Sequence, residues 1–160
     1  MPILLMNKNM LKINALDIIS FSSIPIFLPL LTLVNHLRGP SPTLHLTNRS
    51  ATFLQTNLHP WHSPRPMPKT AAAERLIWRL SHYTPKAACL ERACALKIFL
   101  SCYGVPASVV IGQRLRAHTL LLHAWLETSD GAFFYDENFA ENWRSDNDVE
   151  PSMPSSKAGI

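Results

Sequence analysis

Cysteine is scarce in this sequence of 160 residues, and its spacing excludes several classes of site. Cys89, Cys94 and Cys102 match neither a CxxC pair nor a zinc ligand set, and an odd number fits poorly with a disulfide framework. We therefore expect a reducing, cytoplasmic compartment, with Cys94 and Cys102 as small core residues. His59 and His62 lie in a proline-rich segment without further ligands, so we expect no metal and no cofactor.

Charge is also scarce, and it is unevenly distributed. Charged residues make up 16% of the chain against 47% hydrophobic residues, which suggests that a partner or a membrane surface covers part of the protein. Through Lys86, nine basic residues stand against Asp17 and Glu74, a net charge of +7; the remainder carries six basic and nine acidic residues, a net charge of −3. The first half therefore suits lipid or an acidic peptide, whereas the absence of a binding motif argues against nucleic acid.

A long uninterrupted hydrophobic run is missing. Residues 18–34 are uncharged, but Pro25 and Pro29 interrupt them and no small-x-small cleavage site follows. The stretch is also at the short end of the range for a membrane span. We expect a buried or interfacial helical hairpin that is broken at the prolines, with peripheral membrane contact rather than a spanning helix.

Prolines recur through residues 39–69, a pattern that predicts an irregular connector. We therefore divide the chain into an apolar, basic helical region with its connector (residues 1–69), a core domain (residues 70–145) and a disordered tail (residues 146–160).

Two helices are predicted at the start of the core. Apolar residues recur at helical spacing over residues 71–83, with Thr70 as a plausible N-cap. A second, largely buried helix is expected over about residues 87–102, ending near Gly104. Cys89 then lies in or near the first turn of this helix.

Strands follow the helices. Residues 107–112 are β-branched and bounded by Pro106 and Gly112, which predicts a strand; residues 118–128 and 132–138 are expected to form the second and third strands, and Ser129-Asp130-Gly131 between them is a hairpin turn signal. The expected fold class is α+β, with the N-terminal helices packed on a small antiparallel sheet.

The chemistry depends on whether an imidazole and an acid can reach Cys89. If Asp130-Gly131 forms a two-residue loop, Ser129 pairs with Ala132, and His123 becomes a diagonal neighbour of Asp136 at roughly 7 to 8 Å between Cα atoms. Cys89, His123 and Asp136 are thus candidates for nucleophile, base and orienting acid.

Other interpretations of these residues stay open. A three-residue loop would replace Asp136 by Glu137 on that face, and His118, of opposite parity to His123, is the second-choice base. Each residue also has a structural interpretation, because a helical cysteine or a strand histidine is often only part of a core.

The block "CLERACALKIFLSCYGVPASVVIG", followed by "HAWLE" and "YDE", resembles the leader peptidases of lasso peptide biosynthesis, which are transglutaminase-like cysteine proteases. The resemblance covers residues 71 to about 137. It implies a transglutaminase-like or papain-like core in which Cys89 is the nucleophile, His123 the base and Asp136 the acid. The implied reaction removes the leader from a ribosomally made lasso precursor before macrocyclisation.

The resemblance also implies partners. They are the precursor peptide, a lasso cyclase and a separate leader-recognition protein, because residues 1–70 lack the strand-rich pattern of a fused recognition module. Two alternatives remain: a non-catalytic scaffold that delivers the precursor to the cyclase, or an acyltransferase or deamidase on the same fold.

Overall fold

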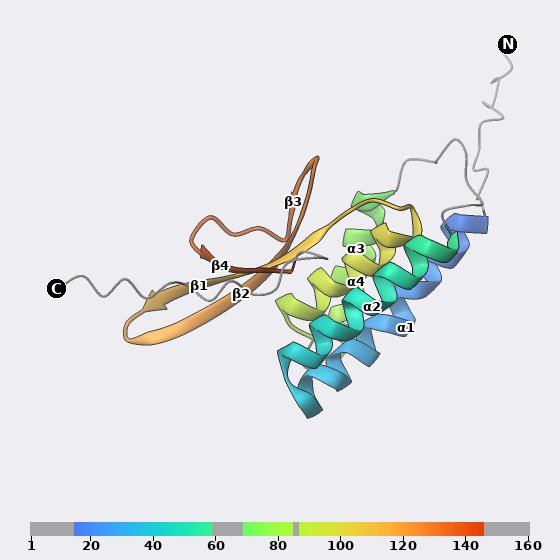
Figure 1. Cartoon of the computed structure of the whole chain (residues 1–160). Coiled ribbons are helices and arrows are strands. Elements are labelled where there is room, and N and C mark those ends of the chain that lie inside the picture. Colours follow the sequence, from blue (N-terminus) through green and yellow to red (C-terminus); the bar gives the residue numbers. More distant parts are fainter. Residues whose placement is uncertain (1–14, 59–68, 85–86, 146–160) are drawn as a thin grey trace, which may run out of the picture.

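The computed structural model describes residues 15–58, 69–84 and 87–145, which form four helices and a four-stranded antiparallel sheet (Figure 1). The sheet lies beside the helices, and the central helix α4 contacts the other three helices as well as β1 and β2. This arrangement of helices and an antiparallel sheet confirms the predicted α+β fold class. The elements are α1 (Ala15–Arg38), α2 (Pro40–Leu58), α3 (Thr70–Tyr83), α4 (Cys89–Cys102), β1 (Ser108–Arg116), β2 (Thr119–Thr128), β3 (Gly131–Phe133) and β4 (Ala140–Ser145).

Helix α1 is continuous through both of its prolines, so the predicted break at Pro25 and Pro29 is wrong. An internal proline costs a helix about 3 kcal/mol. Tertiary packing offsets this cost, because α1 lies against α4 and buries Ile24, Leu28 and Leu31 completely. The local sequence pattern of α1 does not reveal this packing, because the partner helix α4 lies far along the chain.

Helix α2 occupies much of the segment that was expected to be an irregular connector. Gly39, at φ 84°, ends α1, and α2 begins directly at Pro40. Pro40 and Pro42 lie in the first turn of α2, where the missing N–H has no partner to lose, so these prolines start a helix instead of preventing one. Residues 59–68, with the remaining prolines and His59 and His62, lie outside the described residues.

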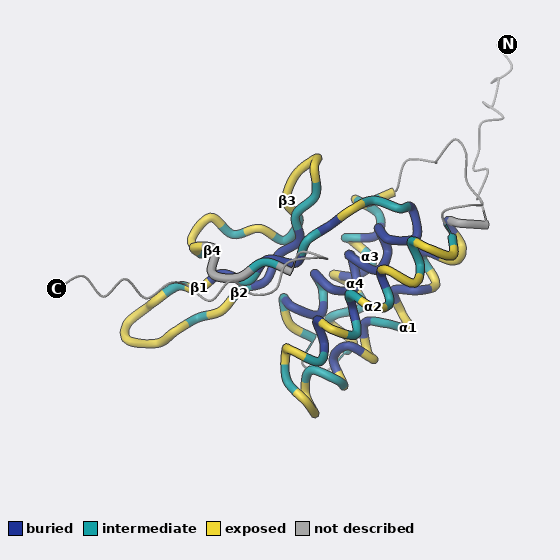
Figure 2. The backbone as a smooth tube through the Cα atoms, in the orientation of Figure 1, coloured by how far each residue is buried: buried dark blue, intermediate teal, exposed yellow. Residues whose placement is uncertain are grey.

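Helices α3 and α4 confirm the two helices predicted at the start of the core. The N-cap of α3 is Lys69 and not Thr70, and the Lys69 ammonium pairs with the Asp17 carboxylate of α1 at 2.8 Å. Nearly every side chain of α4 is buried, and Figure 2 shows this helix in dark blue among the other elements. The chain's division at residue 69 stays a prediction, although α1 and α2 share the core of α4.

The sheet has the strand order β3-β2-β1-β4. Strand β1 is longer than predicted, β3 ends at Phe133 and not near residue 138, and β4 was not anticipated. Strand β4 pairs antiparallel with β1, with a bulge between Ile111 and Gly112. Residues 146–160, which we expected to be disordered, lie outside the described residues.

The register gives the two faces of the sheet different roles. Val109 pairs with Leu126 on the face that packs on the helical core. Val110 pairs with Trp125 and Gly112 with His123 on the opposite face. A Cβ on Gly112 would lie 2.6 Å from Cζ3 of Trp125, so glycine is required for the buried indole to cross β1.

One helix among the described residues is long and apolar enough to cross a membrane, by length and composition only. It is the part of α1 from Asp17 to Arg38. The most apolar stretch of 18 residues in it has a mean hydropathy of 1.8, and 39% of that stretch is buried. Its inner side packs on α4, whereas Ile26, Leu33 and Leu37 are exposed. An apolar core helix meets the same criterion, so this property does not by itself indicate a span.

Candidate active site

Cys89 is the first residue of α4 and follows the N-cap Ala88. Its thiol is free and half-buried, and it packs against the margin of the hydrophobic core. The N–H groups in the first turn of a helix lack intrahelical partners and form the positive end of the helix dipole. Such a terminus stabilises negative charge, which a cysteine nucleophile develops.

A buried carboxylate fixes this terminus. Glu91 is 1% exposed; its Oε2 accepts the Ala88 N–H at 2.9 Å, and its Oε1 accepts the Asn35 side-chain amide of α1 at 2.7 Å. Glu91 therefore ties the segment that carries Cys89 to a neighbouring helix. Sequence reasoning missed this residue, although an acid three positions after an N-cap is half of a capping box.

The other two cysteines are confirmed as core residues. Cys94 is completely buried, and burial raises its pKa to about 12. Burial also raises the pKa of Cys102, whose thiol donates to the Ile98 carbonyl oxygen. Both thiols therefore stay protonated at neutral pH and are poor nucleophiles.

His123 lies in the middle of β2 and uses one ring nitrogen to bond the main chain. Its Nε2 is 2.7 Å from the Phe134 carbonyl oxygen. A carbonyl only accepts, so Nε2 carries the proton and, in the neutral ring, Nδ1 has the free lone pair. The ring is held between Trp125 and Phe139, at centroid distances of 6.2 and 5.1 Å. The imidazole is thus oriented, with Nδ1 available as a base.

Asp136 lies just beyond the end of β3. Its Oδ1 accepts the Asn138 N–H at 3.0 Å and the Asn138 side-chain amide at 2.7 Å. These bonds are the main cause that lowers the pKa of Asp136, and a smaller contribution comes from the charge of His123. The carboxylate is therefore ionised near His123, while the imidazole N–H bonds the Phe134 carbonyl.

The hairpin register differs from the predicted one by two residues. Thr128 pairs with Gly131, so the predicted pair Ser129 and Ala132 is wrong. A shift of two preserves side-chain parity, and the observed register would place Asp136 directly opposite His123 if pairing continued. Pairing stops at Phe133 because Phe134 adopts a positive φ of 60° and turns the chain away.

The two reserve residues lie in exposed positions. His118 forms the β1–β2 turn with Ala117, at φ 66° and 46°, and not the start of a strand. That turn lies at the far end of the hairpin from the helices (Figure 1), about 16 Å along the strand from His123 at about 3.3 Å per residue. Glu137 is exposed.

The structure brings His123 and Asp136 close together, but it does not join them directly to Cys89. Within residues 15–58, 69–84 and 87–145, no hydrogen bond links Cys89 to His123. His123 lies on the face of the sheet that points away from the helical core, whereas Cys89 packs against that core.

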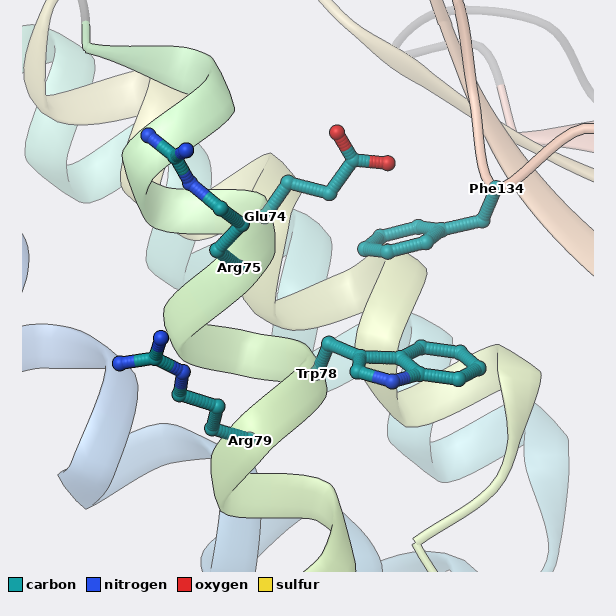
Figure 3. A pocket seen from close by; sticks show the side chains of 5 residues that line it. All are labelled: Glu74, Arg75, Trp78, Arg79 and Phe134. Carbon is teal, nitrogen blue, oxygen red and sulfur yellow. The ribbon is translucent and has the colours of Figure 1, made fainter.

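Phe134 and Trp78 connect the two sides. The Phe134 carbonyl holds His123, and the Phe134 ring packs against the helical core and lines a pocket with Trp78 of α3 (Figure 3). The guanidinium of Arg92 lies 4.6 Å from the Trp78 ring centroid. Arg92 is three residues after Cys89, and residues at this spacing are neighbours on a helix surface. Two residues that line or adjoin this pocket are therefore linked to the proposed catalytic groups, Phe134 to His123 by a hydrogen bond and Trp78 through Arg92 to the first turn of α4.

No group of three or more histidine, cysteine or acidic side chains in the described part of the chain could hold a metal ion.

Comparison with known proteins gives one match. No curated protein and no solved structure showed significant similarity to the chain. A family model described as the transglutaminase-like superfamily matches residues 42–145, which include α4 and all four strands. The match confirms the transglutaminase-like part of the resemblance that "CLERACALK" and "HAWLE" indicate. Since it spans more than half of the sequence, the chain belongs to the transglutaminase-like superfamily.

Proposed function

We propose that this protein is a cysteine peptidase that removes the leader from a lasso peptide precursor before macrocyclisation. Membership of the transglutaminase-like superfamily is consistent with cysteine protease or acyltransferase chemistry. The finer assignment rests on the resemblance of "CLERACALK" and "HAWLE" to leader peptidases. In this proposal Cys89 is the nucleophile, His123 the base and Asp136 the acid that assists the base.

The orientation of His123 is the observation that carries the proposal. With Nε2–H donated to the Phe134 carbonyl, Nδ1 takes the proton of the Cys89 thiol. The thiolate attacks the carbonyl carbon at the end of the leader, and the imidazolium returns the proton to the departing core amine. Water then hydrolyses the thioester and releases the leader. The Cys89 N–H, in the first turn of α4, is a donor for the oxyanion.

Asp136 acts through its charge in this mechanism. Asn138 holds its carboxylate in the ionised form, and the mutual attraction with His123 stabilises the imidazolium that forms after proton transfer. The Phe134 carbonyl fixes the tautomer, a task that the orienting acid has in a Ser-His-Asp triad. Asp136 is therefore a positioning and electrostatic residue whose removal lowers the rate without removing the nucleophile.

We propose a separate leader-recognition protein as the partner of α1 and α2. The outer face of α1 exposes Ile26, Leu33 and Leu37, at 63%, 53% and 69%. A pocket of about 490 Å³ beside it is lined by Arg38, Arg49 and His45 among others, and none of the described residues that line it is acidic. An acidic, partly apolar protein surface fits this region, and the released core peptide then passes to a separate cyclase. Peripheral contact with anionic lipid is the alternative, which co-sedimentation with phosphatidylglycerol vesicles tests.

One observation favours the non-catalytic scaffold. The described residues contain no hydrogen bond between Cys89 and His123, and a scaffold needs none. The two functions differ in the reactivity of the thiol. A peptidase requires Cys89 to be alkylated faster than a free thiol, whereas a scaffold does not.

The test uses the full chain with a lasso precursor and a leader-binding partner, followed by mass spectrometry. Cys89→Ala is expected to abolish cleavage, and His123→Ala to lower it by about 10²-fold or more. His118→Ala is the matched control and is expected to keep full activity, because His118 lies in the distant turn. Undiminished cleavage by Cys89→Ala would refute the assignment of the nucleophile.

A further inference from the structure

A pocket of about 370 Å³ lies between α3 and the residues that follow β3. It is lined by Glu74, Arg75, Trp78, Arg79 and Phe134. In Figure 3, the rings of Trp78 and Phe134 lie on the same side of α3, and the guanidinium groups of Arg75 and Arg79 point away from both rings. The surface that the pocket offers to a ligand is therefore mainly aromatic.

Contacts connect the lining of this pocket to the segments that carry both proposed catalytic groups. On one side, the Phe134 carbonyl oxygen accepts the His123 Nε2–H at 2.7 Å. On the other side, Arg92 covers Trp78, and its Nε donates to the Ala88 carbonyl oxygen at 3.2 Å, next to Cys89. A substrate whose scissile bond lies between Cys89 and His123 would place a neighbouring side chain here.

The charges around the pocket select against ionised side chains. Arg92 already lies over the Trp78 ring, so a basic side chain at that ring would meet like charge. The Glu74 carboxylate and the electron-rich ring faces disfavour an acidic side chain. An apolar group, in contrast, removes the half-exposed Trp78 ring from water.

We propose that this pocket binds an apolar or aromatic side chain of the peptide substrate next to the bond that is cut. The inference rests on the proposed function, because it takes Cys89 and His123 as the reacting groups. It adds a substrate class, because it predicts that the precursor carries an apolar or aromatic residue at one position next to the cut. The catalytic residues alone do not determine that residue.

Alkylation of Cys89 in the full chain tests the pocket without a known precursor. The rate constants for iodoacetamide and for N-benzyliodoacetamide are measured at about pH 7 by mass spectrometry of the Cys89 peptide. The benzyl reagent is expected to react about tenfold faster than iodoacetamide, the ratio expected for partial burial of one phenyl ring. The small reagent corrects for the intrinsic reactivity of the thiol.

Variants of the pocket residues test whether the pocket causes the faster reaction of the benzyl reagent. Trp78→Ala and Phe134→Ala are expected to bring the ratio close to one; the second keeps the carbonyl that holds His123. Trp78→Phe is expected to keep most of the preference. Tyr83→Ala is the matched control, because Tyr83 is an aromatic residue of the same helix, 84% exposed and outside the pocket lining.

The outcomes separate the two proposals. Rapid alkylation of Cys89 with the same reagent ratio in wild type and Trp78→Ala overturns the pocket and leaves the proposed peptidase standing. Alkylation of Cys89 by iodoacetamide no faster than in the urea-unfolded chain overturns the peptidase, and the pocket inference with it.

Discussion

Replacement of Glu91 by alanine tests how the N-terminus of α4 is held. The Glu91 carboxylate accepts two hydrogen bonds in a site with 1% exposure, one from Asn35 and one from the Ala88 N–H. Alanine leaves both donors without an acceptor. A hydrogen bond to a charged group contributes about 1.5 to 3 kcal/mol. We therefore expect Glu91→Ala to lower the free energy of unfolding by about 3 to 5 kcal/mol.

Glu91→Gln tests the contribution of the two hydrogen bonds separately from that of side-chain length. Glutamine has the same length, but its single amide oxygen can accept from only one of the two donors, and its NH₂ group faces the other. We expect this variant to lose about half as much stability as Glu91→Ala.

Urea unfolding followed by far-UV circular dichroism measures these differences, with Glu137→Ala as the control. Glu137 is exposed, so its replacement should change stability by no more than about 0.5 kcal/mol. Equal stability of Glu91→Ala and Glu137→Ala would show that the buried carboxylate does not hold α4, and would refute the reasoning.

Two further predictions concern packing and pH. Gly112→Ala places a Cβ 2.6 Å from the Trp125 ring and 2.8 Å from the Ala140 carbonyl oxygen. This substitution should therefore lower the free energy of unfolding, measured by urea titration, by about 1 to 3 kcal/mol. An unchanged free energy would contradict the close approach of the Trp125 ring to β1. Burial raises the pKa of Cys94 from 9.0 to about 12, so the folded chain keeps a proton that the unfolded chain loses. Stability is then expected to fall as pH rises between these values, and Cys94→Ala should flatten that fall in titrations at several pH values. An equally steep fall in the variant contradicts a contribution from Cys94.

Much of α4 and the two longest strands could be read from the sequence. The apolar pattern after Ala87 predicts a buried helix, the β-branched run at residues 107–112 predicts β1, and the turn signal at Ser129-Asp130-Gly131 marks the end of β2, because these signals are local. The parity that relates His123 to Asp136 also survives, since a register shift of two keeps side chains on the same face.

The errors lie where local and long-range contributions conflict. Pro25 and Pro29 predict a break, but the burial of α1 on α4 outweighs their cost. Strand β4 was missed because its pairing partner, β1, lies far earlier in the chain. Glu91 has a weak local signal as half of a capping box, but its bond to Asn35 joins residues 56 positions apart.

The sequence by itself determined the fold class, the place of Cys89 at a helix entrance and the face of the hairpin that carries His123, because these follow from repeats of 3.6 and 2 residues. Only the tertiary structure decided which atom orients the imidazole, where pairing stops, and that Trp78, which Arg92 covers, lines one pocket with Phe134. Such contacts join residues distant in the chain, and their geometry depends on how whole elements pack.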